Sequence, residues 1–254
     1  MNHFNLEGRV AIVTGGNGGI GLGMATGMAE AGATLVLAGR NAEKGAAAVS
    51  SLEAIGAKAS FFTLDVTDEA ACHALIEDTA SRHGRLDVLI NNAGSNIRKE
   101  PEDYTLEEFR FVLDTNLTSA FCCSQAAYPA MKQSGGGKII NIGSMFSLFG
   151  ASFSTAYAAS KGGIVQMTKA MACAWAKDNI QVNSVLPGWI DTELTKGARK
   201  DVEGLHERIE ARTPAARWGR PDEFAGIAVF LAGTGSDFVT GTSIAIDGGF
   251  SAQG

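Results

Sequence analysis

Short apolar runs alternate along the chain with longer segments whose apolar positions repeat at helical spacing. The runs cover residues 9–13, 34–39, 59–66, 86–91, 138–144, 180–186 and 242–247. Several, such as LVLA and VLIN, are apolar at nearly every position, which is typical of strands buried on both faces of a parallel sheet. Helical segments between the strands indicate βαβ units with right-handed crossovers. The pattern predicts an α/β, doubly wound parallel sheet of about seven strands, flanked by helices on both faces.

One charged segment interrupts this alternation. Residues 193–214, ELTKGARKDVEGLHERIEARTP, are poor in apolar side chains and follow a predicted strand end. Ligands of such sheets bind at the carboxyl ends of the strands, so a segment at this place can cover a substrate. A pair of solvated surface helices explains the composition equally well. We expect a single nucleotide-binding domain over residues 1–254, with residues 191–212 as a segment that covers the substrate.

The composition of the chain mainly disfavours several classes of protein. Hydrophobic residues make up 45% and charged residues 19% of the 254 positions, which is globular composition. A formal net charge of −6 disfavours a nucleic-acid surface. The N-terminus lacks the pattern of a secretory signal, and no apolar run reaches bilayer-spanning length, so we expect a cytoplasmic protein without membrane contact. The four cysteines and four histidines are not spaced as metal ligands or as a disulfide framework.

The stretch VTGGNGGIGLG at residues 13–23 contains two overlapping glycine patterns. One reads G-x-G-x-x-G from Gly16, and the other reads T-G-x-x-x-G-x-G from Thr14. Both lie between a predicted strand and a predicted helix, where backbone N–H groups can receive a pyrophosphate. A tight turn without a ligand remains an alternative, and these residues alone do not select one pattern.

Polar residues near other strand ends supply the candidate chemistry. In AYAASKGG, helical spacing puts Tyr157 and Lys161 on one face. A free phenol has a pKa of about 10, and a neighbouring ammonium together with an oxidised nicotinamide would lower it toward a useful base. Ser144 ends a predicted strand thirteen residues earlier, and Asn116 stands in a helical stretch where it is mildly unfavourable. The motif NNAG at residues 91–94 follows another strand. Taken singly, each could be an ordinary polar residue.

Together these motifs resemble the short-chain dehydrogenase/reductase family over essentially the whole chain, in the family's order. The resemblance selects the glycine pattern that starts at Thr14 and implies a Rossmann-like fold. It implies hydride transfer between a nicotinamide cofactor and a hydroxyl or carbonyl carbon, with no metal. In that scheme Tyr157 is the general acid/base and Ser144 polarises the reacting oxygen. Lys161 holds the nicotinamide ribose and lowers the tyrosine pKa, while Asn116 positions a proton-relaying water.

The segment LVLAGRN bears on the choice of cofactor. Gly39 and Arg40 stand where a carboxylate would select NAD, and an arginine can pair with a 2'-phosphate. We therefore expect NADP(H). NAD(H) stays possible because Gly18 occupies the position where many NADP-using relatives carry a second basic residue. The expected cofactor residues are Gly15, Asn17, Gly19, Ile20, Gly21, Arg40, Asn41, Asp65, Val66, Asn92, Ala93, Gly94, Tyr157, Lys161, Pro187, Gly188, Ile190 and Thr192.

Four stretches bear on the substrate. IINIGSMFSLFG, AWAKDNIQVN, RWGRPDEFAG and IAIDGGF are similar to a branch of gluconate 5-dehydrogenases, 2-deoxy-D-gluconate dehydrogenases and glucose dehydrogenases, which implies a sugar, sugar acid or polyol. On the loop after NNAG, Arg98 could attract a substrate carboxylate, although Lys99 beside it could simply be solvated. The expected substrate residues are Ser144, Met145, Tyr157, Trp189, Asn96 and Arg98.

Two rival functions and an assembly state complete the sequence-based expectations. A 3-oxoacyl-[acyl-carrier-protein] reductase would share every catalytic motif, and a non-catalytic NADP-binding module would share the glycine turn. The resemblance also implies a homotetramer. Apolar segments VFLAG at 229–233 and TSIAIDGGF at 242–250 are the suspected interface, because such patches are otherwise an aggregation liability.

Overall fold

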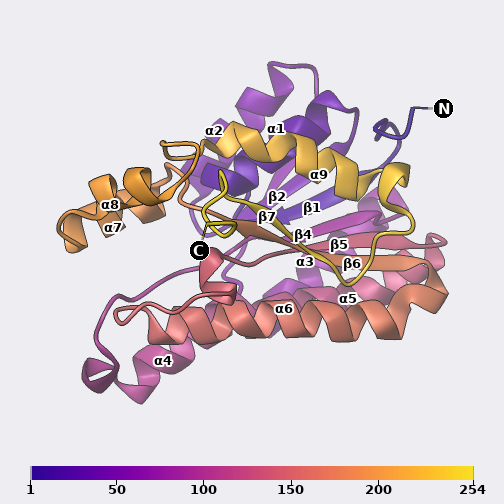
Figure 1. Ribbon diagram of the computed structural model, residues 1–254. Coiled ribbons are helices and arrows are strands. Elements are labelled where there is room, and N and C mark those ends of the chain that lie inside the picture. The colour runs from indigo at the N-terminus through magenta and orange to yellow at the C-terminus, as the bar shows by residue number, and fades with distance from the viewer. Residues whose placement is uncertain (1, 254) are drawn as a thin grey trace.

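A single parallel sheet of seven strands forms the centre of the computed structural model, which describes residues 2–253 (Figure 1). The strand order is β3-β2-β1-β4-β5-β6-β7, and it reverses between β1 and β4, where such sheets open a ligand crevice. The predicted strands are confirmed, with ends that move by three residues or fewer. The strands are β1 Val10–Thr14, β2 Thr34–Gly39, β3 Ala59–Thr63, β4 Val88–Asn91, β5 Gly137–Ile142, β6 Ile180–Pro187 and β7 Ser243–Ile246.

Helices cover both faces of this sheet, as the sequence pattern predicts. One layer contains α1 (Gly19–Glu30), α2 (Ala42–Glu53) and α9 (Ala225–Ala232). The other contains α3 (Glu69–His83), α4 (Leu106–Leu113), α5 (Ser119–Gln133) and α6 (Thr155–Trp175). Two further helices, α7 (Glu193–Asp201) and α8 (Leu205–Arg212), project beyond the end of β6, at the left of Figure 1. The charged segment is therefore a helix pair at the carboxyl end of the sheet.

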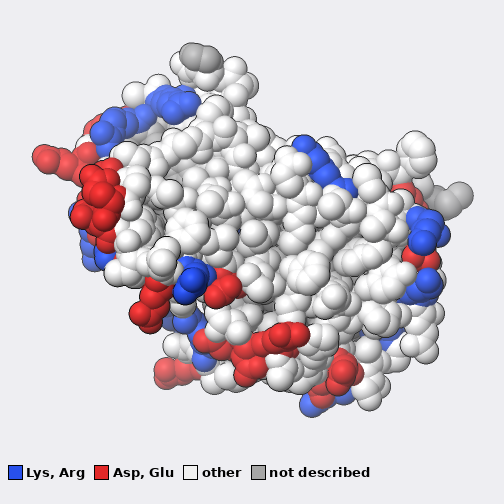
Figure 2. Space-filling model, turned by 90° about the horizontal axis from the view of Figure 1, so that it is seen from below, with Lys and Arg blue, Asp and Glu red and all other residues white. Residues whose placement is uncertain are grey.

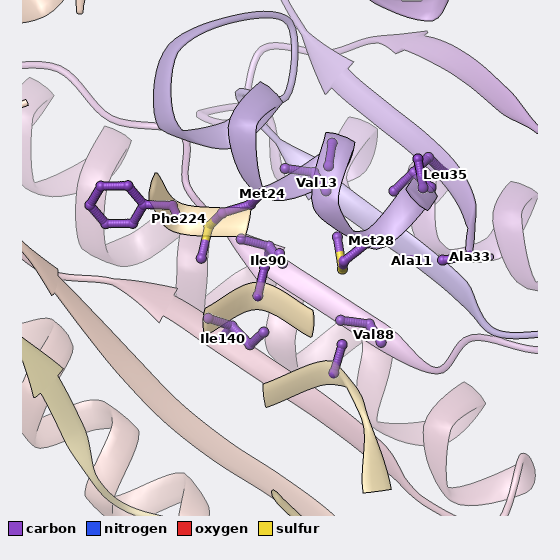
Figure 3. Packing of buried hydrophobic residues seen from close by; sticks show 14 of the residues in the cluster. Ala11, Val13, Met24, Met28, Ala33, Leu35, Val88, Ile90, Ile140 and Phe224 are labelled. Atoms are coloured by element: carbon purple, nitrogen blue, oxygen red, sulfur yellow. The ribbon is translucent and has the colours of Figure 1, made fainter. Parts of the chain in front are cut away.

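The core lies between the sheet and each helical layer. In the first layer Met24 and Met28 of α1 face Val13 and Ile90 of the sheet, with Phe224 beside them (Figure 3). All five side chains are fully buried. Burying an apolar side chain of this size contributes about 1.5–3 kcal/mol, so this layer fixes the position of the turn before α1. The opposite layer buries a second cluster from α3, α5 and α6 against the other face.

Asp87 anchors the amino ends of the two central strands. Its carboxylate is 1% exposed and accepts hydrogen bonds from the Val10 N–H at 2.9 Å, from Arg85 at 2.6 and 2.8 Å and from Arg9 at 3.0 Å. Burial raises the pKa of Asp87, but these hydrogen bonds together lower it by a larger amount, so the pKa lies below its usual value. This anchor lies at the edge of the sheet opposite to the carboxyl ends of the strands.

Residues 2–253 contain neither a membrane-spanning helix nor a cluster of metal ligands. No helix there is both long enough and apolar enough to cross a membrane. Within the same range, no group of three His, Cys, Asp or Glu side chains is arranged to hold a metal ion. The four cysteines are free thiols.

Candidate active site

The turn between β1 and α1 has the geometry of the T-G-x-x-x-G-x-G pattern. Gly15 and Gly19 have positive φ angles of 63° and 52°, which favour glycine. A Cβ on Gly21 would lie 2.5 Å from the Asn92 side chain, so the helix could not approach as closely. Gly18, the middle glycine of the rival pattern, is extended with open space around it. The fold therefore requires the glycines of the pattern that the family resemblance selects.

Asn92 ties this turn to the NNAG loop. Its side-chain amide donates to the carbonyls of Thr14 and Gly15 at 3.0 and 3.1 Å. In return the Thr14 hydroxyl accepts hydrogen bonds from the backbone N–H groups of Asn92 and Ala93, at 3.0 and 3.1 Å. The glycine turn and the NNAG loop thus form one rigid wall.

A cleft of about 430 Å³ opens beside this wall. Most of the expected cofactor residues line it. Gly21 is packed beneath the turn, and Pro187, Gly188, Ile190, Tyr157 and Lys161 stand outside this lining. The lining residues are Gly15, Asn17, Gly18, Gly19, Ile20, Gly39, Arg40, Asn41, Lys44, Leu64, Asp65, Val66, Asn92, Ala93, Gly94, Phe111, Thr115, Thr192, Glu193 and Leu194.

The cleft carries two basic side chains near the end of β2. Arg40 is exposed there, and Lys44, which the sequence analysis missed, joins it from the first turn of α2. A Cβ on Gly39 would lie 3.2 Å from the Asn17 amide, so a side chain at this position would require Asn17 to shift by a few tenths of an ångström. Two cations without an opposing carboxylate at residue 39 fit a 2'-phosphate. Lys44 could have been predicted as a cofactor residue, because it lies in the first turn of the helix that follows β2, and this turn faces the cleft.

Three of the expected catalytic side chains meet where β5 ends. Ser144 follows β5, and Tyr157 and Lys161 lie in the first turns of α6. The Ser144 side chain is near enough to the Tyr157 phenol to lower the pKa of the phenol. Lys161 Nζ lies 5.6 Å from the centre of the Tyr157 ring and donates to the Ile142 carbonyl at 2.7 Å. One oxygen of a ligand can therefore reach both hydroxyl groups, with a cation behind the phenol.

Burial dominates the electrostatics of this group. It raises the pKa of Tyr157, while the nearby Ser144 side chain and the positive charge of Arg98 lower it by less. Burial also lowers the pKa of Lys161, which is 3% exposed, to about 8. We expected Lys161 and an oxidised nicotinamide together to depress the tyrosine pKa. The groups of the protein itself leave it raised, because the phenol is desolvated more strongly than it is stabilised as phenolate.

Asn116 joins the loop after β4 to α6. It lies in a π-helical turn, Asp114–Thr118, which separates α4 from α5; such turns are frequent at functional sites. Its side-chain oxygen accepts from the Ser95 N–H at 2.7 Å, and its amide donates to the Ser95 carbonyl at 2.9 Å and to the Ser160 hydroxyl at 3.0 Å. The side chain is thus engaged by the protein and holds two walls of the site together.

The loop after NNAG reaches the helix pair through Arg98. Nη1 of Arg98 donates to the Asp201 carboxylate at 3.2 Å, and Nη2 donates to the Leu194 carbonyl at 3.1 Å. The Asn96 amide donates to the Ser154 hydroxyl at 3.3 Å, and its buried side-chain oxygen has no hydrogen-bond partner among the described residues. Lys99 pairs with Glu108 of α4 instead. Of the two basic side chains on this loop, Arg98 is therefore the one directed toward α7.

Aromatic rings connect the phenol to the helix pair. Phe146 makes edge contacts with Tyr157 and with Trp189, each at 6.0 Å between ring centres. Trp189 contacts Trp218 at 5.6 Å, and the Arg199 guanidinium of α7 lies 3.9 Å from the Trp218 ring. The sequence analysis missed Phe146 and Trp218, because a ring that lines a site has no pattern distinct from a core ring. Of the expected substrate residues, Met145 is buried in the cluster beneath this wall.

Comparison with known proteins decides the family. A family model described as "Enoyl-(Acyl carrier protein) reductase" matches residues 15–251. A 2-dehydro-3-deoxy-D-gluconate 5-dehydrogenase of Dickeya dadantii is 40% identical over 254 residues, which cover 100% of this chain and 99% of that protein. The chain belongs to the short-chain dehydrogenase/reductase family. As a member of this family it is an oxidoreductase, which disfavours a binding module without chemistry.

Two further relatives of this short-chain dehydrogenase/reductase carry similar names. A gluconate 5-dehydrogenase of Gluconobacter oxydans is 40% identical, and the match covers 98% of each chain. The crystal structure of a gluconate 5-dehydrogenase from Burkholderia cenocepacia, in complex with NADP and tartrate, has a TM-score of 0.94 at 38% identity. That match covers 100% of this chain and 99% of that one. The Rossmann-like sheet therefore belongs to a known architecture.

Proposed function

We propose that this protein transfers hydride between NADP(H) and a hydroxyl or carbonyl carbon of a sugar acid. The observation that carries the proposal is the position of Arg98. Its guanidinium is close enough to the Ser144–Tyr157 pair to lower the pKa of the phenol, in a site walled by aromatic rings. A carboxylate at one end of a substrate would pair with Arg98 while an oxygen farther along the substrate meets Tyr157.

Each polar group then has a distinct task. The cofactor supplies or takes the hydride. Tyr157 gives a proton to the substrate oxygen in reduction and takes it in oxidation, and the Ser144 hydroxyl hydrogen-bonds the same oxygen. At neutral pH Lys161 carries a positive charge behind the phenol, because its pKa is about 8, and it would hold the nicotinamide ribose. Asn116 fixes the loop that faces α6, and its π-turn is the proposed place of a proton-relaying water.

The residues of the cleft fit NADP(H). Arg40 and Lys44 are both within the lining, and residue 39 is a glycine, which cannot supply the carboxylate that selects NAD(H). The NADP bound to the Burkholderia cenocepacia relative supports this assignment, and the tartrate in the same complex, itself a hydroxylated dicarboxylate, supports an acidic substrate. The description of the matching family model, an enoyl-(acyl carrier protein) reductase, favours an acyl-carrier substrate as the alternative to a sugar acid.

A substrate panel tests the proposal. Sugars, sugar acids, polyols and acetoacetyl thioesters are each assayed with both cofactors by nicotinamide absorbance. We expect the highest kcat/KM for a sugar acid with NADP(H). In the Arg98→Ala variant KM for the acid should rise about tenfold or more, since a hydrogen-bonded charge pair is lost, with little change for a neutral sugar. Efficient reduction of acetoacetyl thioesters, without activity on any sugar acid, would transfer the protein to the acyl-carrier class.

A further inference from the structure

We propose that Asp201, at the end of α7, sets how strongly the site prefers anionic over neutral substrates, because it competes with the substrate carboxylate for Arg98. This inference rests on the proposed function, since it requires a substrate with a carboxylate. Asp201 acts through Arg98 and is therefore a selectivity residue, not a catalytic one.

The contacts of Arg98 carry the argument. Its side chain is 14% exposed, whereas that of Asp201 is 53% exposed, so an interior cation is met by a carboxylate that reaches in from the helix pair. The second contact, to the Leu194 carbonyl, comes from the first turn of the same helix. Between them, a Cβ on Gly197 would lie 3.7 Å from Nη1. The guanidinium is thus spread along the inner side of α7.

These contacts occupy two of the five N–H donors of the Arg98 guanidinium. A guanidinium binds a carboxylate most strongly when two parallel N–H groups face its two oxygens. Here Nη1 and Nη2 of Arg98 each donate one hydrogen bond to α7, to the Asp201 carboxylate and to the Leu194 carbonyl. Among residues 2–253, this is the only ion pair that joins the loop at 95–100 to the segment at 191–212. A substrate carboxylate must therefore displace Asp201 or bind beside it.

Both routes weaken the binding of a substrate carboxylate. Displacement costs the Arg98–Asp201 pair, and binding beside it brings two carboxylates close together, which repel each other. The positive charge of Arg98 acts at the phenol, so the contested cation belongs to the site of reaction. A neutral substrate meets neither cost. Removing the charge of Asp201 should therefore improve the binding of acids alone.

The Asp201→Asn variant tests this inference through the ratio of kcat/KM for a sugar acid to that for a neutral sugar. We expect KM for the acid to fall about two- to fivefold, the range of exposed ion pairs, with kcat and the neutral substrate little changed. Asp201→Glu keeps the charge and should retain the wild-type ratio. The matched control is Glu207→Gln on α8, which removes one negative charge from an exposed position of the same segment and should leave the ratio unchanged.

The outcomes separate the two proposals. If Asp201→Asn leaves the ratio unchanged or lowers it, Asp201 supports Arg98 rather than competing with the substrate, and the inference is overturned. An equal rise in Glu207→Gln also overturns it, because the effect would be one of overall charge. If the acid is a substrate and Arg98→Ala raises its KM in either case, the proposed function survives. If wild-type enzyme turns over no sugar acid, both fail.

Discussion

The charge of Arg98 has a second effect at the scale of single residues. Oxidation of a hydroxyl needs the phenolate of Tyr157, so kcat/KM for oxidation should rise with pH. Burial raises the pKa of Tyr157, and Ser144 and Arg98 partly offset this rise. Without the cation the pKa of the phenol must be higher still, so in Arg98→Ala the increase should move to higher pH. The profile is measured with a neutral substrate, which makes no carboxylate contact; superimposable profiles would contradict the assignment.

Cofactor choice is also decided by single side chains. We expect wild-type kcat/KM to be higher with NADP(H) than with NAD(H), because Arg40 and Lys44 both line the cleft. Arg40→Asp removes one partner of the 2'-phosphate and adds repulsion, so it should shift preference toward NAD(H). Lys44→Ala removes a partner without adding a negative charge and should shift it less. A wild-type preference for NAD(H) would refute this account.

Among the secondary-structure elements, those with a strong pattern of apolar positions were the ones that the sequence predicted correctly. Strands such as β2 and β4 were predicted because they are apolar throughout and end at polar or glycine residues. The π-turn around Asn116 was not, because one extra residue per turn hardly changes a helical period. The pairing of Arg98 with Asp201 joins residues 103 positions apart, and no local pattern encodes such a contact. The proposed catalytic residues were identified from the order of the motifs, whereas the aromatic wall depends on packing that no motif encodes.

Residues 191–212 contain the helix pair α7 and α8. We propose that α7 and α8 cover the substrate. Their apolar contacts are few, with Ala198, Leu205 and Ile209 as the buried side chains, so local opening should be easy. Cofactor plus substrate should therefore protect residues 191–212 from limited proteolysis more than cofactor alone. Equal protection with and without substrate would leave these helices as a fixed part of the surface.

At the scale of the whole molecule, two surfaces support our expectation of a homotetramer. β7 is an edge strand, as the suspected segment 242–250 requires, and its Ala245 is exposed. On the side of α4, α5 and α6, charged side chains gather near the rim and leave the centre largely uncharged (Figure 2). Phe111 and Phe121 are 39% and 46% exposed in a groove formed by α4 and α5, a surface that the sequence analysis missed.

Sedimentation at micromolar concentration tests this assembly. We expect a mass near four subunits, because self-complementary apolar surfaces on a soluble protein are normally covered by copies of the same chain. Phe121→Glu places a charge in the groove and should reduce the mass, while Phe238→Glu, at an exposed position outside this groove, should not. A wild-type mass near one subunit excludes the tetramer.

The most direct measurement of the central claim compares wild type with Tyr157→Phe. The claim is that this phenol moves the proton while hydride passes between NADP(H) and a sugar acid. The substitution removes only the hydroxyl group, so NADPH should still bind, as followed by its fluorescence. Turnover of the sugar acid, followed by absorbance, should fall by about 10²- to 10⁴-fold. Residual turnover above a tenth of the wild-type rate, with NADPH bound normally, would contradict the assignment of Tyr157 and the mechanism built on it.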